Sequence, residues 1–182
     1  YEPFFGGGAL FFALQPANAV LSDANAGLIN LYLQVRDNSD ELVRIVNGFN
    51  NSEIDYYKIR ATSPRTPVRK AARLLYLTRL SFNGIHRVNL RGEFNVPYGQ
   101  KTHLRPVDKN LVCSASALLQ SATIIAGDFE HVTKDAKKGD FIYFDPPYTV
   151  AHGQNGFIKY NEKIFSWNDQ ERLAAHARLL AS

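Results

Sequence analysis

The segment "GDFIYFDPPY", residues 139–148, constrains the fold more than any other part of the sequence. Its apolar run ends on Asp145, and Pro146, Pro147 and Tyr148 follow. A short apolar run with polar ends is typical of a buried strand. A residue before proline is disfavoured in helical geometry, and proline donates no backbone hydrogen bond. We therefore expect a buried strand that ends in a stiff turn, with the Asp145 carboxylate pointing outward.

This turn offers hydrogen-bond acceptors that suit an amino group. Because two successive residues lack an N–H, nearby carbonyls stay available as acceptors beside the Asp145 carboxylate. Two acceptors that hold the hydrogens of a base amine favour a pyramidal nitrogen, whose lone pair can attack a methyl group. The carboxylate offsets the positive charge that develops, and Tyr148 offers a flat face for stacking. The alternative is that Asp-Pro only shapes a turn at a strand end.

The stretch "YEPFFGGGALFFALQ" at the N-terminus predicts a second binding element. A strand end, three glycines and a helix let the backbone approach a ligand closely and aim helix N–H groups at negative charge. The next strand ends at Asp23, whose carboxylate can accept hydrogen bonds from both hydroxyls of a ribose. Phe11 breaks the dinucleotide pattern G-x-G-x-x-G, so these residues suggest an adenosine-containing ligand without requiring a pyrophosphate. A plain tight turn is the alternative for the glycines.

The order of the predicted elements indicates the fold class. Strand, glycine turn, helix, strand, acid and helix begin a doubly wound, Rossmann-like α/β sheet. Apolar periodicity predicts helices over residues 26–37, 40–49, 67–81, 108–122 and 167–180, and strands over 122–129 and 139–148. The turn signals Asn83-Gly84 and Arg91-Gly92 indicate a β-hairpin or ordered loop after the basic helix. We expect an α/β domain of residues 1–50 and 121–182, with a mainly helical insertion of residues 51–120.

Positive charge is concentrated in this insertion. The formal net charge is +4, yet 11 Lys or Arg and a single acid, Glu93, lie between Lys58 and Arg105. Aromatic and amide side chains, among them Phe82, Asn83 and Asn89, alternate with these bases. Such a mixture indicates a surface that follows phosphates and reads bases, whereas a solvated basic face is the alternative.

The composition excludes several classes of protein. The chain is 45% hydrophobic and 21% charged, as in an ordinary globular domain, and it has no apolar run of the length that crosses a bilayer. We therefore expect no membrane span and no export signal, and a cytoplasmic location by default. Cys113 is the single cysteine, and the five histidines lack ligand spacing, so no disulfide and no metal site is expected. A monomer is assumed.

Three motifs together resemble one enzyme family. They are "DPPY", the Phe4-x-Gly6-x-Gly8 pattern, and "RLSFNGIHRVNLRGEFNVPYG" over residues 79–99, which is far more specific than the others. The chain is similar over essentially its whole length to the Dam-type, D12-class adenine-N6 DNA methyltransferases. The resemblance implies S-adenosylmethionine as methyl donor and, as acceptor, an adenine flipped out of duplex DNA, with GATC as the site. It also implies a recognition region inserted before the DPPY turn.

The resemblance also implies roles for individual residues of the α/β domain. Phe4, Gly6 and Gly8 would line the cofactor, and Asp23 would bind its ribose. Asp128 and Phe129 match the pair that meets the cofactor adenine; a helix N-cap with a core aromatic is the alternative. The target base would be held by Asp145, Pro146, Pro147 and Tyr148, with Asp145 also beside the cofactor.

In the insertion, the family pattern implies a DNA-binding surface. Phe82 and Asn83 would wedge into the opened base stack, and Arg87 would read a guanine edge with two hydrogen bonds. Ile85 and Pro97 would contact neighbouring bases. Phosphate contacts would come from Arg69, Lys70, Arg73, Arg91 and Lys101, and Asn89 is also expected on the DNA-binding surface. Arg91-Gly92 could instead be only the tip of the hairpin.

The sequence departs from the family pattern at both ends. An N-terminal Gly-Gly-Lys element and the strands that complete the sheet have no counterpart, so the chain is expected to be an incomplete enzyme. Gly27, Thr78 and Ser81 also differ from the usual residues. The alternatives left open are a catalytically inactive DNA-binding remnant and an amino-methyltransferase acting on cytosine or RNA. A restriction endonuclease is the expected counterpart if the chain belongs to a restriction-modification pair.

Overall fold

The computed structural model describes residues 1–89, 91–147 and 165–181, which form two compact units. Unit 1 is Tyr1–Ala24 with Thr123–Ser182, and unit 2 is Asn25–Ala122. This division concerns packing within the chain. The functional division into residues 1–50 with 121–182 and an insertion of 51–120 stays a prediction.

Unit 1 contains a small parallel sheet. β1 (Ala19–Asp23) pairs with β2 (Ala122–Ala126), and on its other side Glu2 pairs with Leu21 in parallel. Beyond that segment, the Tyr1 nitrogen donates to the Phe141 carbonyl (2.8 Å) and the Tyr143 N–H donates to the Tyr1 carbonyl (2.9 Å). The order across the sheet is therefore β2, β1, the N-terminal segment, and the segment that leads to Asp145.

The prediction of a buried strand over residues 139–148 is wrong as far as residue 147, where this part of the description ends. The described part of the segment is extended, pairs only with Tyr1, and has no buried residue, with Phe141 66% exposed. The two hydrogen bonds with Tyr1 have the alternating pattern of a parallel ladder. The next rung would need an N–H from Pro3, which proline lacks. The ladder ends there, although the chain still runs in the predicted direction.

The glycine turn leads from the sheet into α1 (Ala9–Leu14). Gly6 has φ 48° and Gly8 has φ 66°, a left-handed conformation that L-residues with a side chain rarely adopt. A Cβ on Gly8 would lie 2.6 Å from Cζ of Phe5, whereas a Cβ on Gly7 would meet no atom within 4 Å. Gly8 is therefore required by both backbone and packing, and Gly7 by neither.

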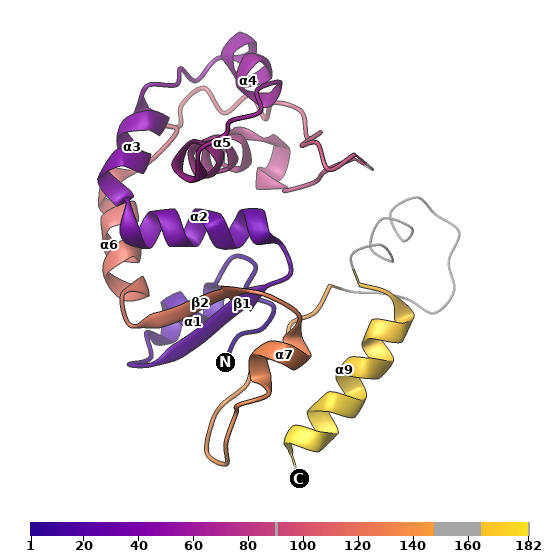
Figure 1. Ribbon diagram of the computed structural model, residues 1–182. Coiled ribbons are helices and arrows are strands. Elements are labelled where there is room, and N and C mark those ends of the chain that lie inside the picture. Colours follow the sequence, from indigo (N-terminus) through magenta and orange to yellow (C-terminus); the bar gives the residue numbers. More distant parts are fainter. Residues whose placement is uncertain (90, 148–164, 182) are drawn as a thin grey trace. The chain divides into compact units, whose positions relative to one another are not determined.

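Two further helices lie in the described part of unit 1. α7 (Phe129–Thr133) follows β2, and α9 (Trp167–Leu180) packs against α7 (Figure 1). Ser166 and Asp169 form a reciprocal capping box at the start of α9. Between sheet and helices lies an aromatic core of Phe4, Phe129 and Phe165 with Leu173. The Phe4 ring lies 5.5 Å from both the Phe129 and the Phe165 rings, which is the spacing of favourable aromatic pairs.

Unit 2 is helical. Its helices are α2 (Ala26–Asp37), α3 (Ser39–Asn47), α4 (Glu53–Arg60), α5 (Pro67–Leu80) and α6 (Lys109–Leu119). α5 is central: it packs against α2, α3 and α4 and buries Ala71, Ala72, Tyr76, Leu77 and Leu80 (Figure 1). Pro67 stands in its first turn, where its missing N–H costs nothing. The helix over residues 67–81 is thereby confirmed within one residue.

The segment after α5 forms the expected turns. A single 3₁₀ turn, η1 (Phe82–Gly84), is followed by an antiparallel bridge between Val88 and Phe94. The Asn89 N–H donates to the Glu93 carbonyl (2.8 Å), and Gly84 and Gly92 have φ 69° and 78°. The two dipeptides with glycine thus mark the two turns, as the sequence predicted. In the described part of the chain, no helix is both long and apolar enough to span a membrane.

Gly8→Ala tests the packing of the glycine turn. We expect a loss of about 2–3 kcal/mol of unfolding free energy, because the methyl group adds left-handed strain and a clash with the Phe5 ring. Gly7→Ala is the matched control and should change stability by less than about 0.5 kcal/mol. Urea unfolding followed by circular dichroism measures both. Equal losses for the two variants would contradict this description of the turn.

Candidate functional site

The residues predicted to bind cofactor and target base lie in unit 1, and those predicted to bind DNA lie in unit 2. Each group is described within its own unit. Tyr148 lies outside the described residues.

The glycine turn and the acid at the end of β1 are in direct contact. The Gly6 N–H donates to Oδ2 of Asp23 at 3.0 Å. Gly7 is exposed, and an added Cβ there would meet open space. The turn therefore presents a length of bare backbone beside a partly exposed carboxylate. This combination can bind a ligand with hydroxyl groups and can approach it without an intervening side chain.

The predicted cofactor residues Phe4, Gly8 and Phe129 face the protein core. The Phe4 ring contacts Phe129 and lies 6.4 Å from the ring of Phe144, which directly precedes Asp145. Phe129 is 3% exposed. The space over Gly8 is filled by Phe5 and Phe12. These residues support the walls of the site, and their contact with a cofactor stays a prediction.

Asp128 begins α7 as its N-cap residue. Its Oδ1 accepts a hydrogen bond from the Glu130 N–H (3.1 Å) and another from Nη2 of Arg172 (3.0 Å). The N-cap hydrogen bond of Asp128 and the buried Phe129 ring match the alternative interpretation of this pair, which is a helix N-cap followed by a core aromatic. They do not exclude a ligand, because the Asp128 side chain is 47% exposed.

Asp145 is exposed at the end of the extended segment. A buried acid that the sequence analysis missed, Glu2, lies near it. Burial is the main cause that raises the pKa of Glu2. A hydrogen bond from the Phe11 N–H and the charge of the Tyr1 amino group lower it, and the Asp145 carboxylate raises it slightly. An acid next to Pro3 and the glycine turn was the only signal in the sequence.

In unit 2, the segment after α5 exposes apolar and amide side chains. Phe82 is 54% exposed and Ile85 is 46% exposed. Asn83 is exposed and has φ 53°, so the 3₁₀ turn is bent at this residue. Pro97 is exposed, and its carbonyl accepts the Phe82 N–H at 3.0 Å. The predicted wedge and base-contact residues therefore lie on neighbouring stretches of one surface.

Arg87 and Asn89 are held by partners across the hairpin. Nε of Arg87 donates to Oδ1 of Asn95 at 2.9 Å, and Nδ2 of Asn89 donates to Oε2 of Glu93 at 2.8 Å. The hydrogen bond to Asn95 uses Nε of Arg87, and the two terminal amino groups lie at the other end of the guanidinium. That end is suited to two hydrogen bonds with one guanine edge.

The predicted phosphate partners fall into two groups. Arg69, Lys70 and Arg91 are exposed. Arg73 instead donates to the carbonyls of Ile59 and Arg60 at the end of α4, and burial, followed by the charge of Arg60, lowers its pKa. Nζ of Lys101 donates to the Arg79 carbonyl at 3.3 Å. A pocket of about 510 Å³ is lined by Arg60, Lys70 and Arg73 with Asn89 and Asn95.

Asn51 anchors the end of this surface and was not predicted. Its Nδ2 donates to the carbonyls of Lys101 and Leu104, both at 2.8 Å, and its Oδ1 accepts from the Tyr98 hydroxyl at 2.7 Å. Tyr56 adds a hydrogen bond to the Val96 carbonyl (3.1 Å). An asparagine just before a helix is usually a capping residue, so its sequence position gave no sign of this role. Among the described residues, no group of His, Cys, Asp and Glu could hold a metal ion.

Comparison with known proteins gives consistent matches. The model of the D12 class N6 adenine-specific DNA methyltransferase family matches residues 1–182. The Type II methyltransferase M1.LlaDCHI of Lactococcus lactis subsp. cremoris is 43% identical over 95% of this chain and 64% of its own length. The Type II methyltransferase M.MjaIII of Methanocaldococcus jannaschii is 34% identical over 98% of the chain and 68% of its length. A DNA adenine methylase of Serratia marcescens is 35% identical over 99% and 68%.

Asn51→Ala tests the anchor of the surface in unit 2. We expect a loss of about 2–3 kcal/mol of unfolding free energy, because two carbonyls and one hydroxyl lose a partly buried partner. Asn47→Ala, at an exposed position at the end of α3, is the control and should change little. Hydrogen exchange of residues 96–104 should accelerate in Asn51→Ala alone. Unchanged exchange there would show that Asn51 does not hold the segment.

Proposed function

The chain belongs to the D12 class of N6 adenine-specific DNA methyltransferases, and we propose that it transfers a methyl group from S-adenosylmethionine to the N6 amine of an adenine flipped out of duplex DNA. Family membership rests on the match over the whole chain. The chain spans 64% of the length of the Lactococcus relative, so the activity is proposed for the protein that contains it.

The order of extended segments supports a Rossmann-like sheet. Numbered along the chain, the segments lie third, second, first and fourth, which is one half of the doubly wound order together with the first strand of the other half. In open α/β sheets, ligands bind outside the carboxyl ends of the strands, where the order reverses. Here the reversal lies between the N-terminal segment and the segment that leads to Asp145. The glycine turn, Asp23 and Asp145 follow the carboxyl ends of these segments.

The residues at this edge fit S-adenosylmethionine, which supplies an electrophilic methyl group on a sulfonium. Asp23, held by the Gly6 N–H, would accept the ribose hydroxyls, and the bare backbone at Gly6-Gly7 would allow close approach. The Asp128 carboxylate would accept a hydrogen bond from the exocyclic amine of the cofactor adenine. The exposed Asp145 carboxylate at this edge would favour a ligand with a positive charge.

Asp145 and the turn after it would prepare the target amine. The carboxylate and a backbone carbonyl of Asp145-Pro146 would each accept one N–H of the flipped adenine, which localises the nitrogen lone pair. Positive charge would develop on this nitrogen as it takes the methyl group and the sulfonium becomes a neutral thioether, and the Asp145 carboxylate would stabilise that charge. Asp145 would also be able to accept the proton that the nitrogen releases. Tyr148 is proposed to stack on the base.

Unit 2 would recognise the DNA. We assign guanine reading to Arg87, base-stack insertion to Phe82 and Asn83, and apolar base contacts to Ile85 and Pro97, with GATC as the site. The concentration of cations around Lys70 and the 510 Å³ pocket favours phosphate binding. Two relatives are named as Type II methyltransferases, which favours a role beside a restriction endonuclease.

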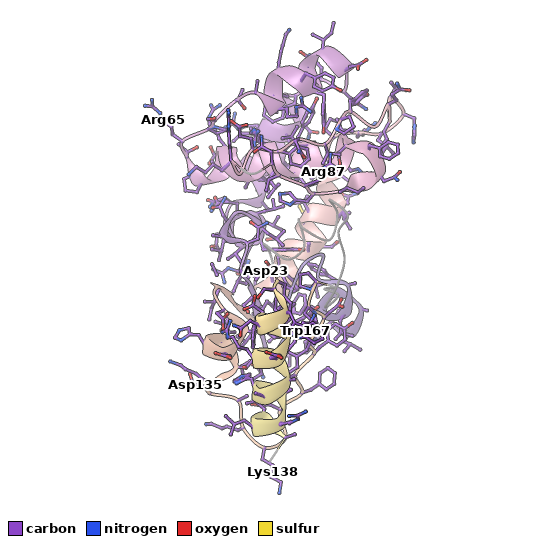
Figure 2. The ribbon with its side chains drawn as sticks, turned by 90° about the vertical axis from the view of Figure 1, so that its right-hand side faces the viewer. Asp23, Arg65, Arg87, Asp135, Lys138 and Trp167 are labelled. Atoms are coloured by element: carbon purple, nitrogen blue, oxygen red, sulfur yellow. The ribbon has the colours of Figure 1, made fainter. Side chains whose placement is uncertain are left out.

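Methyl transfer from tritiated S-adenosylmethionine tests the proposed chemistry. We expect incorporation into a GATC duplex, and much less into a scrambled duplex or RNA. Asp145→Asn should lower incorporation by at least about 100-fold, because the acceptor for the amine and its charge is lost. Asp135→Asn changes an exposed acid of the same unit, on the turn after α7 (Figure 2), and should be neutral. Full activity of Asp145→Asn would exclude the proposed role.

Arg87→Ala tests base reading against phosphate binding. The variant should bind GATC about 1–3 kcal/mol more weakly and lose discrimination at one base position. Arg65→Ala, at an exposed arginine at the edge of unit 2 (Figure 2), should at most weaken all sequences slightly. Fluorescence anisotropy with single-base variants of the site measures both. If Arg87→Ala weakens every sequence equally, Arg87 contacts the backbone instead.

A further inference from the structure

Arg172 of α9 joins three carboxylates that come from two elements. Its Nη2 lies 3.0 Å from Oδ1 of Asp128 and 3.0 Å from Oε2 of Glu130, and its Nη1 lies 2.9 Å from Oδ1 of Asp169. The guanidinium carbon also lies 5.0 Å from the centre of the Phe129 ring. One side chain therefore joins the N-cap and the first turn of α7 to the first turn of α9.

Stability alone is a weak reason for this arrangement. The Arg172 side chain is 35% exposed, and partly exposed ion pairs contribute little to folding. α9 has other attachments to α7 and the core, since Leu173 is buried and Nε2 of His176 lies 2.6 Å from Oγ1 of Thr133. The helix should therefore stay docked without Arg172. What Arg172 adds is a second hydrogen bond on the Asp128 carboxylate and an ion pair with Glu130.

Asp128 is the carboxylate on which this orientation has a chemical consequence. Its two described hydrogen bonds, from Arg172 and from the Glu130 N–H, both end on Oδ1 and fix the direction of the carboxyl group. Without the guanidinium, Asp128 and Glu130 would face each other as like charges two residues apart. The Glu130 N–H would then be the one described donor that holds Oδ1, so the carboxylate would be less well aligned with a ligand beside the turn.

We propose that Arg172 is a positioning residue that holds the Asp128 carboxylate ready to accept the exocyclic amine of the cofactor adenine. This inference rests on the proposed function and adds a residue on a helix that has no other place in the site. It predicts that Arg172 controls recognition of position 6 of the purine, where adenine has an amine and hypoxanthine a carbonyl. An oriented carboxylate binds the first and repels the second.

Calorimetric titration with S-adenosylhomocysteine and S-inosylhomocysteine tests the proposal. The two ligands differ only at the purine, so their affinity ratio isolates recognition of its 6-position. Arg172→Ala should lower the affinity for S-adenosylhomocysteine by about fivefold to tenfold and the affinity for the inosine analogue by less than about twofold. The affinity ratio of the two ligands should therefore fall. Asp128→Ala should remove the preference, so that the affinity ratio is close to one. Arg172→Lys should restore part of it, because lysine keeps the charge but not the planar fork.

Arg178→Ala is the matched control, because Arg178 is an exposed arginine on the same helix. It should leave both affinities unchanged, and thermal melting should show all variants folded. If Arg172→Ala does not fold, Arg172→Lys carries the test. An unchanged ratio in the arginine variants, whether affinity falls equally for both ligands or not at all, would overturn the proposal. A wild-type protein that binds neither ligand would overturn the proposed function itself.

Discussion

The N-terminal segment, hydrogen-bonded on both sides, places the glycine turn, Asp23 and Asp145 at one edge of the sheet. On one side Glu2 pairs with β1, and on the other Tyr1 pairs with the residues before Asp145. Because all these segments are parallel, their carboxyl ends meet at one edge of the sheet. The glycine turn, Asp23 and Asp145 lie there as a consequence. The Gly6–Asp23 hydrogen bond then joins the first two of these directly.

In each unit, some side chains hold other side chains or loops of the proposed binding sites in place. Asn51 holds carbonyls of the segment after the hairpin, and Asn95 orients Arg87. Arg172 does the same for Asp128 in unit 1. A carboxylate or guanidinium on a surface has many accessible rotamers, and a partner that fixes one of them lowers the entropy lost when a ligand binds. This explains why residues that are predicted to bind a ligand lie next to residues that have no predicted ligand contact.

Much of this arrangement could be predicted from the sequence, for identifiable reasons. The glycines, Asp23 and the Asp145 turn follow strands, and strand ends converge by topology, so local patterns were sufficient. The turns at Gly84 and Gly92 were visible because each needs a positive φ. α4 was missed because Tyr56 is its only buried residue, which leaves no apolar periodicity. Glu2 and Arg172 were missed because their partners are distant in sequence, and Arg73 was assigned to phosphates although its donors also bind the end of α4.

The central claim is that one edge of the parallel sheet binds an adenosine-containing cofactor beside the Asp145 turn. A crystal structure of the complex with S-adenosylhomocysteine tests it most directly. The account predicts ribose hydroxyls within hydrogen-bond distance of Asp23, the adenine amine at Asp128, and the sulfur on the side of Asp145. A ligand bound at another surface, with Asp23 still bonded only to protein, would contradict it.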